Sequence, residues 1–342
     1  MGALEEQKEW QLGYAKEEEV VTVKDLSITY ETKGKKVEAV KGVSFHINAQ
    51  DSLGIVGESG SGKSTLAMAI LQLLPKKITT VTGEVNFNGK NLLALSEDEM
   101  QPMRWKDLSV VFQKSMNALS PVHKIGNQLV DIYRIHQPKV KKKEAKERMI
   151  SLLDKVNLSP QVFNSYPHEL SGGMMQRVSI ALSLMHQPKL LILDEATTAL
   201  DQVTQRQILE EIKSVEKEMN LTRLMITHDM SVVATSCNKV AVMYAGRIVE
   251  FGLVSNVLTN PQHPYTKGLL KSIPSFKGEK ENIRGIPGSI PDLSKKVSGC
   301  IFKDRCEFAM EICEQKVPEE ISVERDHRVA CHLIGGGADY AS

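Results

Sequence analysis

The sequence predicts an α/β fold with a parallel sheet at its core, and three observations support this prediction. Residues 189–193 and 223–227 are apolar and have the length of buried strands. Residues 203–219, which lie between them, have the apolar spacing of an amphipathic helix, and a strand–helix–strand order is typical of parallel sheets. A further apolar strand, 51–56, runs directly into a glycine-rich loop.

The N-terminal part of the chain predicts an arm, a pair of strands and a helix. Residues 1–19 are polar and charged, and we expect them to form an N-terminal arm. The alternating segments 20–30 and 37–47 predict an antiparallel pair of strands. We expect a helix at 64–74, because apolar side chains recur there at helical spacing and Pro75 follows.

The middle of the chain, about 114–187, is predicted to form a mainly helical subdomain. The segment before it should form short elements of both types. In chain order, we expect a strand and turn at 83–89, a short helix at 94–107 capped by Ser96, a strand at 108–112, and helices at 125–135, at 140–156 and after Ser171.

The charge and hydropathy of the chain exclude several classes of protein. Lys plus Arg number 43 and Asp plus Glu 42, which leaves a formal net charge of +1. A protein that holds nucleic acid by charge needs a basic excess, so we expect no nucleic-acid partner. No apolar run approaches the roughly 18 residues of a membrane-spanning helix. The N-terminus lacks the apolar core of a secretory signal, so we expect a cytosolic location.

The composition changes after about residue 255, where we place a domain boundary. The main domain then covers 20–255 and a C-terminal extension covers 256–342. Five prolines between positions 261 and 291 predict a mostly extended chain in this region. Four of the five cysteines also lie in the extension, and clustered cytosolic thiols more often hold metal than form disulfides. The four are Cys300, Cys306, Cys313 and Cys331.

The glycine-rich loop after the strand at 51–56 fits the phosphate-binding loop (P-loop) pattern G-x-x-x-x-G-K-S. Its glycines allow backbone conformations in which successive N–H groups converge on phosphate oxygens. The helix that starts near Lys63 adds its positive dipole end. Lys63 would contact the β- and γ-phosphates, and Ser64 would be a Mg²⁺ ligand. The predicted phosphate-binding residues are Gly57, Ser59, Gly60, Ser61, Gly62, Lys63, Ser64 and Thr65.

Two acidic residues follow the apolar strand at 189–193. Asp194 emerges at its C-terminal end, where open α/β sheets bind ligands, and is predicted to hold Mg²⁺. Glu195 is one residue further and is placed to polarise an attacking water as a general base.

The segment Leu-Ser-Gly-Gly-Met-Met-Gln-Arg at 170–177 resembles the LSGGQ-type signature of the ATP-binding cassette (ABC) ATPases, and it lies between the P-loop and Asp194 as in that family. Ser171, Gly172 and Gly173 open a helix, so free N–H groups can point at a negative charge. The resemblance implies a nucleotide-binding domain with an antiparallel β subdomain and a helical signature subdomain. It also implies a head-to-tail dimer, in which the signature of one subunit closes on the γ-phosphate of ATP held by the other.

Four other positions match the ABC family residue by residue. Gln113 resembles the Q-loop glutamine that touches Mg²⁺ and senses the membrane partner. Asp201 falls in a segment that resembles the D-loop, which crosses the dimer interface. His228 matches the switch histidine that contacts the γ-phosphate, and Tyr30 lies where the family places an aromatic ring against adenine.

Three further segments resemble the dipeptide, oligopeptide and nickel importer ATPases. They are residues 112–121, residues 263–274, and the segment 286–288 with Cys300, Arg305 and Cys306 beyond it. The resemblance implies an importer subunit at the cytoplasmic face of the membrane, with peptides as the solute, or nickel or oligosaccharides as alternatives. Its implied partners are a second, related ATPase, two membrane permeases and, indirectly, an extracytoplasmic solute-binding protein.

The four cysteines of the extension leave three interpretations open. Zinc sites favour tighter Cys pairs than these spacings, and an all-Cys set without such pairs fits an iron–sulfur cluster better. The importer ATPases that the chain resembles include members with a [4Fe–4S] cluster on the corresponding cysteines. Zinc and unligated buried thiols are the alternatives.

Two other classes of function stay open. One is a soluble cassette ATPase that acts on ribosomes or DNA, although such proteins usually carry two cassettes or a long coiled-coil insertion, and this sequence has neither. The other is a redox-regulated scaffold whose ATPase activity is incidental.

Overall fold

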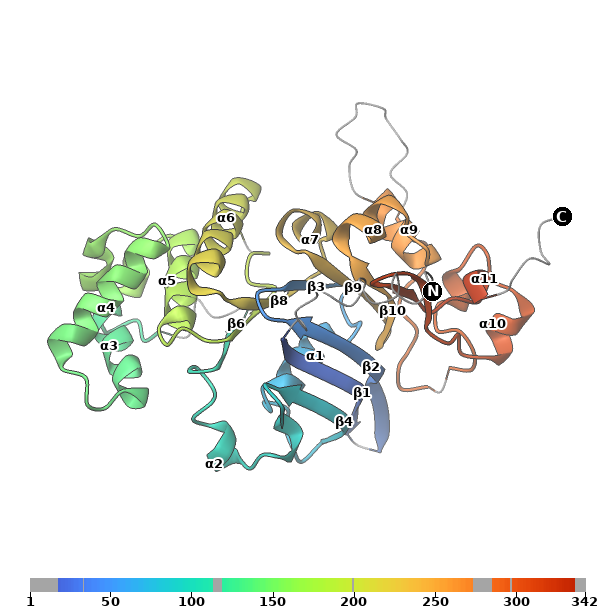
Figure 1. The fold of residues 1–342 in the computed structure, drawn as a ribbon, viewed down its shortest axis with the longest axis horizontal. Helices are drawn as coiled ribbons and strands as arrows, with labels where there is room; N and C mark the ends of the chain where they lie inside the picture. The colour runs from blue at the N-terminus through green and yellow to red at the C-terminus, as the bar shows by residue number, and fades with distance from the viewer. Residues whose placement is uncertain are drawn as a thin grey trace, which may run out of the picture.

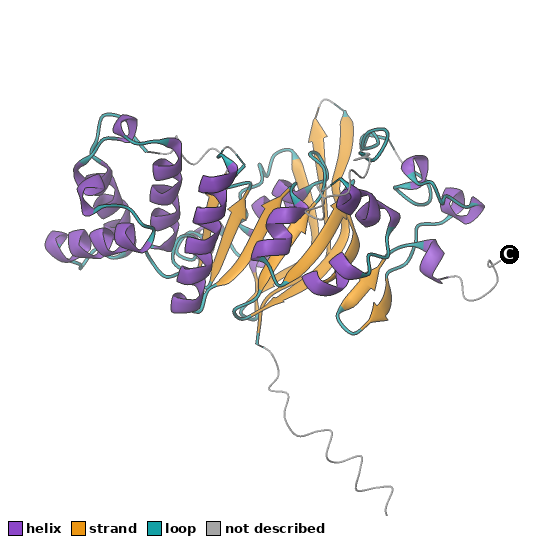
Figure 2. Ribbon diagram, turned by 90° about the horizontal axis from the view of Figure 1, so that it is seen from above, coloured by secondary structure: helices purple, strands orange, loops and turns teal. Residues whose placement is uncertain are grey.

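A computed structural model describes residues 18–32, 34–112, 119–198, 200–272, 285–295 and 297–335. Figure 1 shows a helical region at one end of the molecule, strands in the middle, and the C-terminal segments at the opposite end. The same order of layers is visible from above in Figure 2.

The described chain contains a mixed eight-stranded sheet with the order β11-β12-β10-β9-β3-β8-β7-β6. Five neighbouring strands are parallel, which confirms the predicted parallel core. They are rich in Val, Leu and Ile because strands of this kind are covered on both faces. The five are β3 (Ser52–Val56), β6 (Leu108–Phe112), β7 (Leu190–Asp194), β8 (Thr222–Thr227) and β9 (Lys239–Tyr244).

One edge of this sheet is antiparallel and includes strands of the C-terminal extension. β10 (Arg247–Leu253) pairs with β9, and β12 (His327–Val329) pairs with β10. β11 (Ile321–Glu324) then pairs with β12. The extension therefore continues the sheet of the main domain.

A second, antiparallel sheet lies against the P-loop side of the core and has the order β2-β1-β4-β5. The predicted pair of strands is confirmed as β1 (Glu19–Thr32) and β2 (Lys35–Asn48), joined by β4 (Thr79–Phe87) and the short β5 (Lys90–Asn91). The Lys41 amide donates to Gly246 O at 2.8 Å, and the Gly246 amide donates to Ser61 O at 2.9 Å. These bonds tie the second sheet to the P-loop.

The helices that follow β3 and β5 are shorter than the sequence predicts. α1 (Lys63–Ile70) ends four residues before the expected 74, where Gln72 has a φ of 51°. α2 (Glu97–Met100) starts at the predicted Ser96 cap, whose hydroxyl and Glu99 form a capping box. It stops early because the Trp105 amide donates to Leu108 O at 2.7 Å, which turns the chain into β6.

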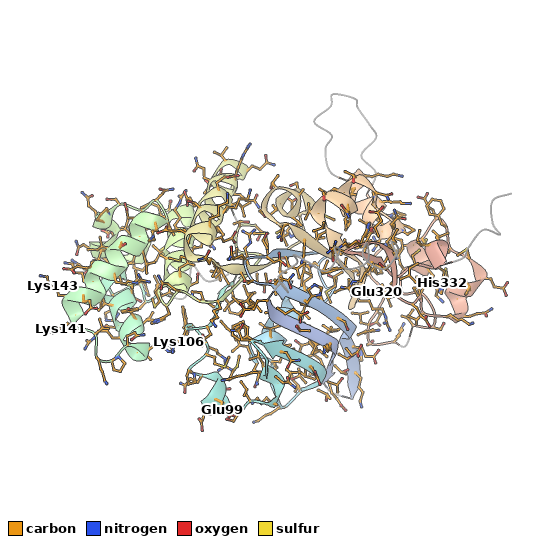
Figure 3. All side chains as sticks on the ribbon, viewed as in Figure 1. Glu99, Lys106, Lys141, Lys143, Glu320 and His332 are labelled. Atoms are coloured by element: carbon orange, nitrogen blue, oxygen red, sulfur yellow. The ribbon has the colours of Figure 1, made fainter. Side chains whose placement is uncertain are left out.

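The helical region predicted at about 114–187 is confirmed from residue 119 onward, and residues 114–118 lie outside the described residues. A 3₁₀ helix, Pro160–Asn164, brings Phe163 against α3 so closely that a Cβ on Gly126 would lie 2.3 Å from the ring. Lys141 and Lys143 extend from the outer end of this region, as Figure 3 shows. Its α-helices, and the helix that returns to the sheet, are α3 (Ile125–His136), α4 (Lys142–Lys155), α5 (Gly172–Leu184) and α6 (Gln202–Met219).

The expectation of a mostly extended chain between 261 and 291 is wrong for α9, while residues 273–284 lie outside the described residues. Pro264 occupies the first turn of α9 and His263 caps it, because proline fits the start of a helix, where its missing N–H is not needed. A proline in this stretch can therefore begin a helix as well as end one. The helices that follow β8 and β10 are α7 (Met230–Ser236), α8 (Val254–Thr259), α9 (Pro264–Lys271), α10 (Glu311–Gln315) and α11 (His332–Gly335).

Within the described residues, every helix is too short or too polar to cross a lipid bilayer.

Candidate functional site

The P-loop joins β3 to α1 and needs glycine at two positions for reasons of space. Gly62 has a φ of 99°, and a Cβ there would lie 2.2 Å from Ala39 O. A Cβ on Gly57 would lie 2.0 Å from Met243 O. The loop is therefore pressed against the backbone of both sheets, with the first turn of α1 directly behind it. The free backbone N–H groups at the start of α1 form a site suited to phosphate.

Lys63 is buried at the start of α1 and folds over the loop. Its Nζ donates to Gly57 O at 2.7 Å and to Glu58 O at 2.8 Å. Burial lowers the pKa of Lys63, and neighbouring carboxylates, led by Glu195, oppose that shift. The ammonium thus lies at the centre of the loop, among groups of opposite charge.

Ser64 and Asp194 are brought together from two different elements. The Ser64 hydroxyl at the start of α1 donates to Asp194 Oδ1 at the end of β7, at 2.9 Å. Burial raises the pKa of the Asp194 carboxyl, and the bond from Ser64 opposes the shift. A hydroxyl and a carboxylate are oxygen ligands of the kind that Mg²⁺ binds, so these two residues fit the predicted metal role.

Glu195 and His228 face each other next to this pair. His228 Nδ1 lies 3.6 Å from Glu195 Oε1, and the histidine side chain is 56% exposed. Glu195 has a φ of 49°, a conformation that is unfavourable for a side chain with a Cβ. The Glu195 amide donates to Ile226 O at 2.9 Å, which holds this turn against β8. Strain of this kind is common at functional sites.

Two other predicted residues have different outcomes. The Tyr30 hydroxyl lies 3.4 Å from Thr65 Oγ1, so its ring is beside the first turn of α1. Gln113 lies outside the described residues, and its predicted role stays a prediction.

The signature segment lies apart from the P-loop. Ser171 caps α5, and its hydroxyl accepts a hydrogen bond from Met174 N at 3.3 Å. Ser171 and Gly172 are exposed. Figure 1 shows α5 beside α4 at one end of the molecule and α1 near its middle. The structure therefore does not bring the signature and the P-loop of one chain together.

The predicted D-loop residue Asp201 caps α6 close to the signature. Its carboxylate accepts from Thr204 N at 2.9 Å and from Thr204 Oγ1 at 2.7 Å. These hydrogen bonds lower the pKa of Asp201. A Cβ on Gly173 would lie 2.8 Å from Thr204 Cγ2, so the starts of α5 and α6 pack tightly.

The four cysteines of the extension gather in one region. The Cys300 amide donates to Cys313 O at 2.8 Å, and burial raises the pKa of Cys331 to about 11, with the other three thiols adding to the shift. Four thiols are a donor set that suits iron–sulfur or zinc. Among the described residues, however, no three His, Cys, Asp or Glu side chains converge closely enough to hold a metal ion. The predicted cluster therefore stays a prediction.

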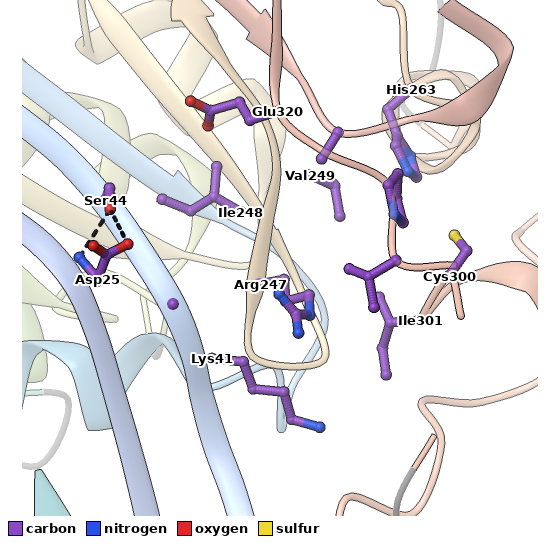
Figure 4. A pocket seen from close by; sticks show the side chains of 14 residues that line it. Asp25, Lys41, Ser44, Arg247, Ile248, Val249, His263, Cys300, Ile301 and Glu320 are labelled. Atoms are coloured by element: carbon purple, nitrogen blue, oxygen red, sulfur yellow. Dashed lines mark hydrogen bonds between the residues drawn. The ribbon is translucent and has the colours of Figure 1, made fainter. Parts of the chain in front are cut away.

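A cavity of about 270 Å³ lies between β2, β10 and the extension, as Figure 4 shows. Lys41 and Arg247 face it near Cys300, while Asp25 and Ser44 form a hydrogen-bonded pair at another side. In the described part of the chain, no predicted nucleotide-binding residue lines this cavity.

Sequence reasoning missed a contact between the extension and the P-loop. Arg305 Nη1 donates to Glu58 Oε2 at 3.0 Å, and the Glu58 amide donates to the Tyr265 hydroxyl at 3.0 Å. Glu58 occupies a variable position of the P-loop pattern, and Arg305 is 247 residues away. No local sequence signal joins two such residues.

Comparisons with known proteins agree with this geometry. Residues 40–198 match the family described as ABC transporter, and residues 249–313 match the C-terminal region of the oligopeptide/dipeptide transporter family. Among solved structures, the dimeric ATP-binding cassette MJ0796 bound to ADP and phosphate has a TM-score of 0.62 and 27% identity, over 68% of this chain and 98% of that one. CbiO1 from Clostridium perfringens has the same TM-score and identity, over 71% and 92%. These likenesses confirm the predicted fold class.

Relatives of known sequence cover nearly the whole chain. The oligopeptide transport ATP-binding protein OppD of Bacillus subtilis is 44% identical over 319 residues, which is 92% of this chain and 89% of that protein. The dipeptide transport ATP-binding protein DppD of Caldanaerobacter subterraneus is 40% identical over 319 residues, 93% and 98% of the two chains. The chain therefore belongs to the ATP-hydrolysing, ATP-binding subunits of ABC transporters, in the oligopeptide/dipeptide family.

Proposed function

We propose that this chain is the nucleotide-binding subunit of an importer for peptides of the dipeptide or oligopeptide class. ATP binding closes a head-to-tail pair of ATPase subunits, and closure and hydrolysis are coupled to uptake through two separate membrane subunits. One observation carries most of the proposal: Ser64, Asp194, Glu195 and His228 meet at the carboxyl ends of parallel strands, beside the P-loop. The names of the relatives support peptides as the solute.

In the proposed site, the P-loop amides and Lys63 bind the β- and γ-phosphates of ATP. Lys63 already lies over the loop on backbone carbonyls, so little movement is needed to exchange them for phosphate oxygens. Ser64 and Asp194 would hold Mg²⁺, which would neutralise charge on the phosphates when bound. Tyr30 would stack on the adenine, and Gln113 would add a contact to the metal.

Glu195 is the proposed general base for hydrolysis. A water attacks the γ-phosphorus, the bond from that phosphorus to the β–γ bridging oxygen breaks, and the water's proton passes to the Glu195 carboxylate. The products are ADP and phosphate. His228, 3.6 Å from Glu195, contacts the transferred phosphoryl group and stabilises its charge.

The second half of the site comes from another subunit. Ser171, Gly172 and Gly173 are at the free end of α5, where unpaired N–H groups and the helix dipole favour a phosphate. Because α5 and α1 are apart within one chain, we infer that the signature of one subunit closes on the P-loop of its partner, with Asp201 at the interface. The partner is a second ABC ATPase, related or identical.

We also propose that the chain divides into an ATPase domain, residues 20–255, and a C-terminal extension, residues 256–342, and that Cys300, Cys306, Cys313 and Cys331 bind a [4Fe–4S] cluster. The chemistry of the four thiols, whose charges influence one another, supports this proposal, with zinc as the alternative. Iron and acid-labile sulfide should be measured in protein purified without oxygen. An iron content that is unchanged in Cys306→Ser would contradict a cluster bound there.

The importer proposal further places the chain on the cytoplasmic face of the membrane, bound to its permeases. The chain should be co-expressed with candidate membrane subunits, purified as a complex and reconstituted in vesicles with a solute-binding protein. Peptide-dependent ATP hydrolysis and peptide uptake are expected, and both should be lost in Glu195→Gln. A complex that hydrolyses ATP with no solute dependence would contradict the importer role, and undiminished hydrolysis in Glu195→Gln would contradict the proposed base.

A further inference from the structure

The P-loop is held from the side of the C-terminal extension by a partly buried ion pair. Arg305 ends the 3₁₀ helix Lys303–Arg305, and its Nη1 donates to Glu58 Oε2 at 3.0 Å. The Arg305 side chain is only 6% exposed and that of Glu58 is 31% exposed. Because the arginine is buried, solvent screens this ion pair less than it screens a pair of two exposed side chains.

The other donors of Arg305 fix its orientation. Its Nε donates to Pro287 O at 2.7 Å and its Nη2 to Ile286 O at 3.2 Å. The guanidinium also lies over the ring of Tyr244, 5.5 Å from the centroid, and donates to the Tyr244 hydroxyl at 3.3 Å. A planar group with so many fixed contacts presents its charge to Glu58 in one position.

A second residue of the extension contacts the same P-loop residue. The Glu58 amide donates to the hydroxyl of Tyr265, on α9. Tyr265 is fully buried, and its ring packs against Tyr244 at 4.7 Å and Phe302 at 5.5 Å between centroids. The extension therefore holds both the backbone and the side chain of Glu58.

The charge of Glu58 matters because of its position. Its carbonyl accepts a hydrogen bond from the Lys63 ammonium at 2.8 Å, so its carboxylate belongs to the loop that binds phosphate. An unpaired carboxylate at this position would repel the negatively charged phosphates of the nucleotide. The repulsion would be strong because the site is partly buried and solvent screens charges there only weakly. Arg305 supplies the compensating positive charge.

We propose that Arg305 is a positioning residue for ATP binding, which neutralises and orients Glu58 so that the extension sets the nucleotide affinity of the P-loop. The inference rests on the proposed function, because it assumes that this P-loop binds ATP. Arg305 touches no reacting atom, so its loss should change affinity and leave the chemical step intact once ATP is saturating.

The test compares the dissociation constant of a fluorescent Mg-ATP analogue with kcat for ATP in the full-length chain. Arg305→Gln should raise the dissociation constant about tenfold, with kcat at saturating ATP unchanged. Arg305→Lys, which keeps the charge and loses the planar fork, should recover part of the affinity. Lys303→Gln is the matched control, because Lys303 lies on the same 3₁₀ helix but pairs with Glu314 of the extension.

The double variant separates charge from packing. Glu58→Gln removes the carboxylate, so Glu58→Gln with Arg305→Gln should restore the affinity to within about twofold of wild type. Glu58→Gln alone should bind at least as tightly as wild type, and this arm holds even if Arg305→Gln folds poorly. Wild-type affinity in Arg305→Gln, no recovery in the double variant, or weakened binding in Glu58→Gln would each overturn the proposal. A wild-type chain that binds no nucleotide would instead contradict the proposed function.

Discussion

The hydroxyl of Ser64 donates a hydrogen bond of 2.9 Å to Asp194 Oδ1, although 130 positions separate the two residues. The bond exists because β3 and β7 are both parallel strands and flank β8 in one sheet, so the loop after one and the acid at the end of the other meet at the same edge. Two oxygen ligands are thus arranged side by side at the mouth of the P-loop.

Asp194→Asn tests the metal role of this pair. The amide keeps the shape of the side chain and can still accept from Ser64, but it has lost the negative charge that Mg²⁺ needs. We expect the Mg²⁺ concentration for half-maximal ATP hydrolysis to rise about 100-fold, measured by titration. Asp154→Asn, an exposed change on α4, should leave the titration unchanged. Equal Mg²⁺ requirements in Asp194→Asn and wild type would rule out this assignment.

Mixing two inactive variants tests the composite site. Ser171→Arg blocks the signature and Lys63→Ala disables the P-loop, so each variant alone should lack hydrolysis. In a head-to-tail pair made of one of each, one site keeps both an intact Lys63 and an intact Ser171. We expect hydrolysis to appear on mixing, in a steady-state phosphate-release assay. A mixture as inactive as its components would argue against a site shared between subunits.

Gly126→Ala should destabilise the helical region. The added methyl group would lie 2.3 Å from the ring of Phe163. This ring is buried among the other apolar side chains of the helical region, so it has little room to move away. Overpacking of this kind costs about 1–3 kcal/mol of unfolding free energy, to be measured by urea denaturation. Gly285→Ala is the matched control, because a Cβ there meets no heavy atom within 4 Å. The explanation fails if the two variants are equally stable.

The stability of the folded chain should depend on pH through His263. Burial lowers the pKa of His263 to about 3, from an ordinary value of 6.5, and its Nδ1 accepts from Tyr265 N at 3.0 Å. Below about pH 6.5 the unfolded chain binds a proton at this histidine, whereas the folded chain does so only near pH 3. The free energy of unfolding therefore decreases as the pH is lowered from about 6.5 to about 3. This residue contributes about 1.4 kcal/mol per pH unit there.

His263→Asn provides the measurement, because asparagine can also cap α9 but does not titrate. The free energy of unfolding of this variant should fall less steeply than that of wild type as the pH is lowered through the same range. Identical slopes would show that His263 is not responsible.

The parts of the site that were predictable have local signals. The glycines before Lys63 and the acid at the end of an apolar strand are read from a few consecutive residues, because the P-loop and strand ends are shaped by their own backbone. The helix start at Ser171 follows the same logic, since a serine before a helix can accept from one of that helix's free N–H groups.

The parts that were not predictable depend on distant residues. Nothing near Glu58 indicates that Arg305 will pair with it, because an ion pair across 247 positions is set by the packing of the extension. α9 was missed because proline was read as a breaker, whereas Pro264 begins this helix. The sharp end of α2 likewise follows from a backbone hydrogen bond between Trp105 and Leu108.

The pairing of β12 with β10 has a consequence for any shortened form of this protein. A chain that ends near residue 255 would lack β12, so the backbone N–H and C=O groups on that edge of β10 would be unpaired. An unpaired edge of this kind can pair with a strand of another molecule. The buried Glu250 carboxylate would also lose its hydrogen-bonding partners. These are His327 Nε2, 2.8 Å away, and the backbone amides of Gln262 and His263. The ATPase domain expressed alone should therefore aggregate, even though all of its catalytic residues are present.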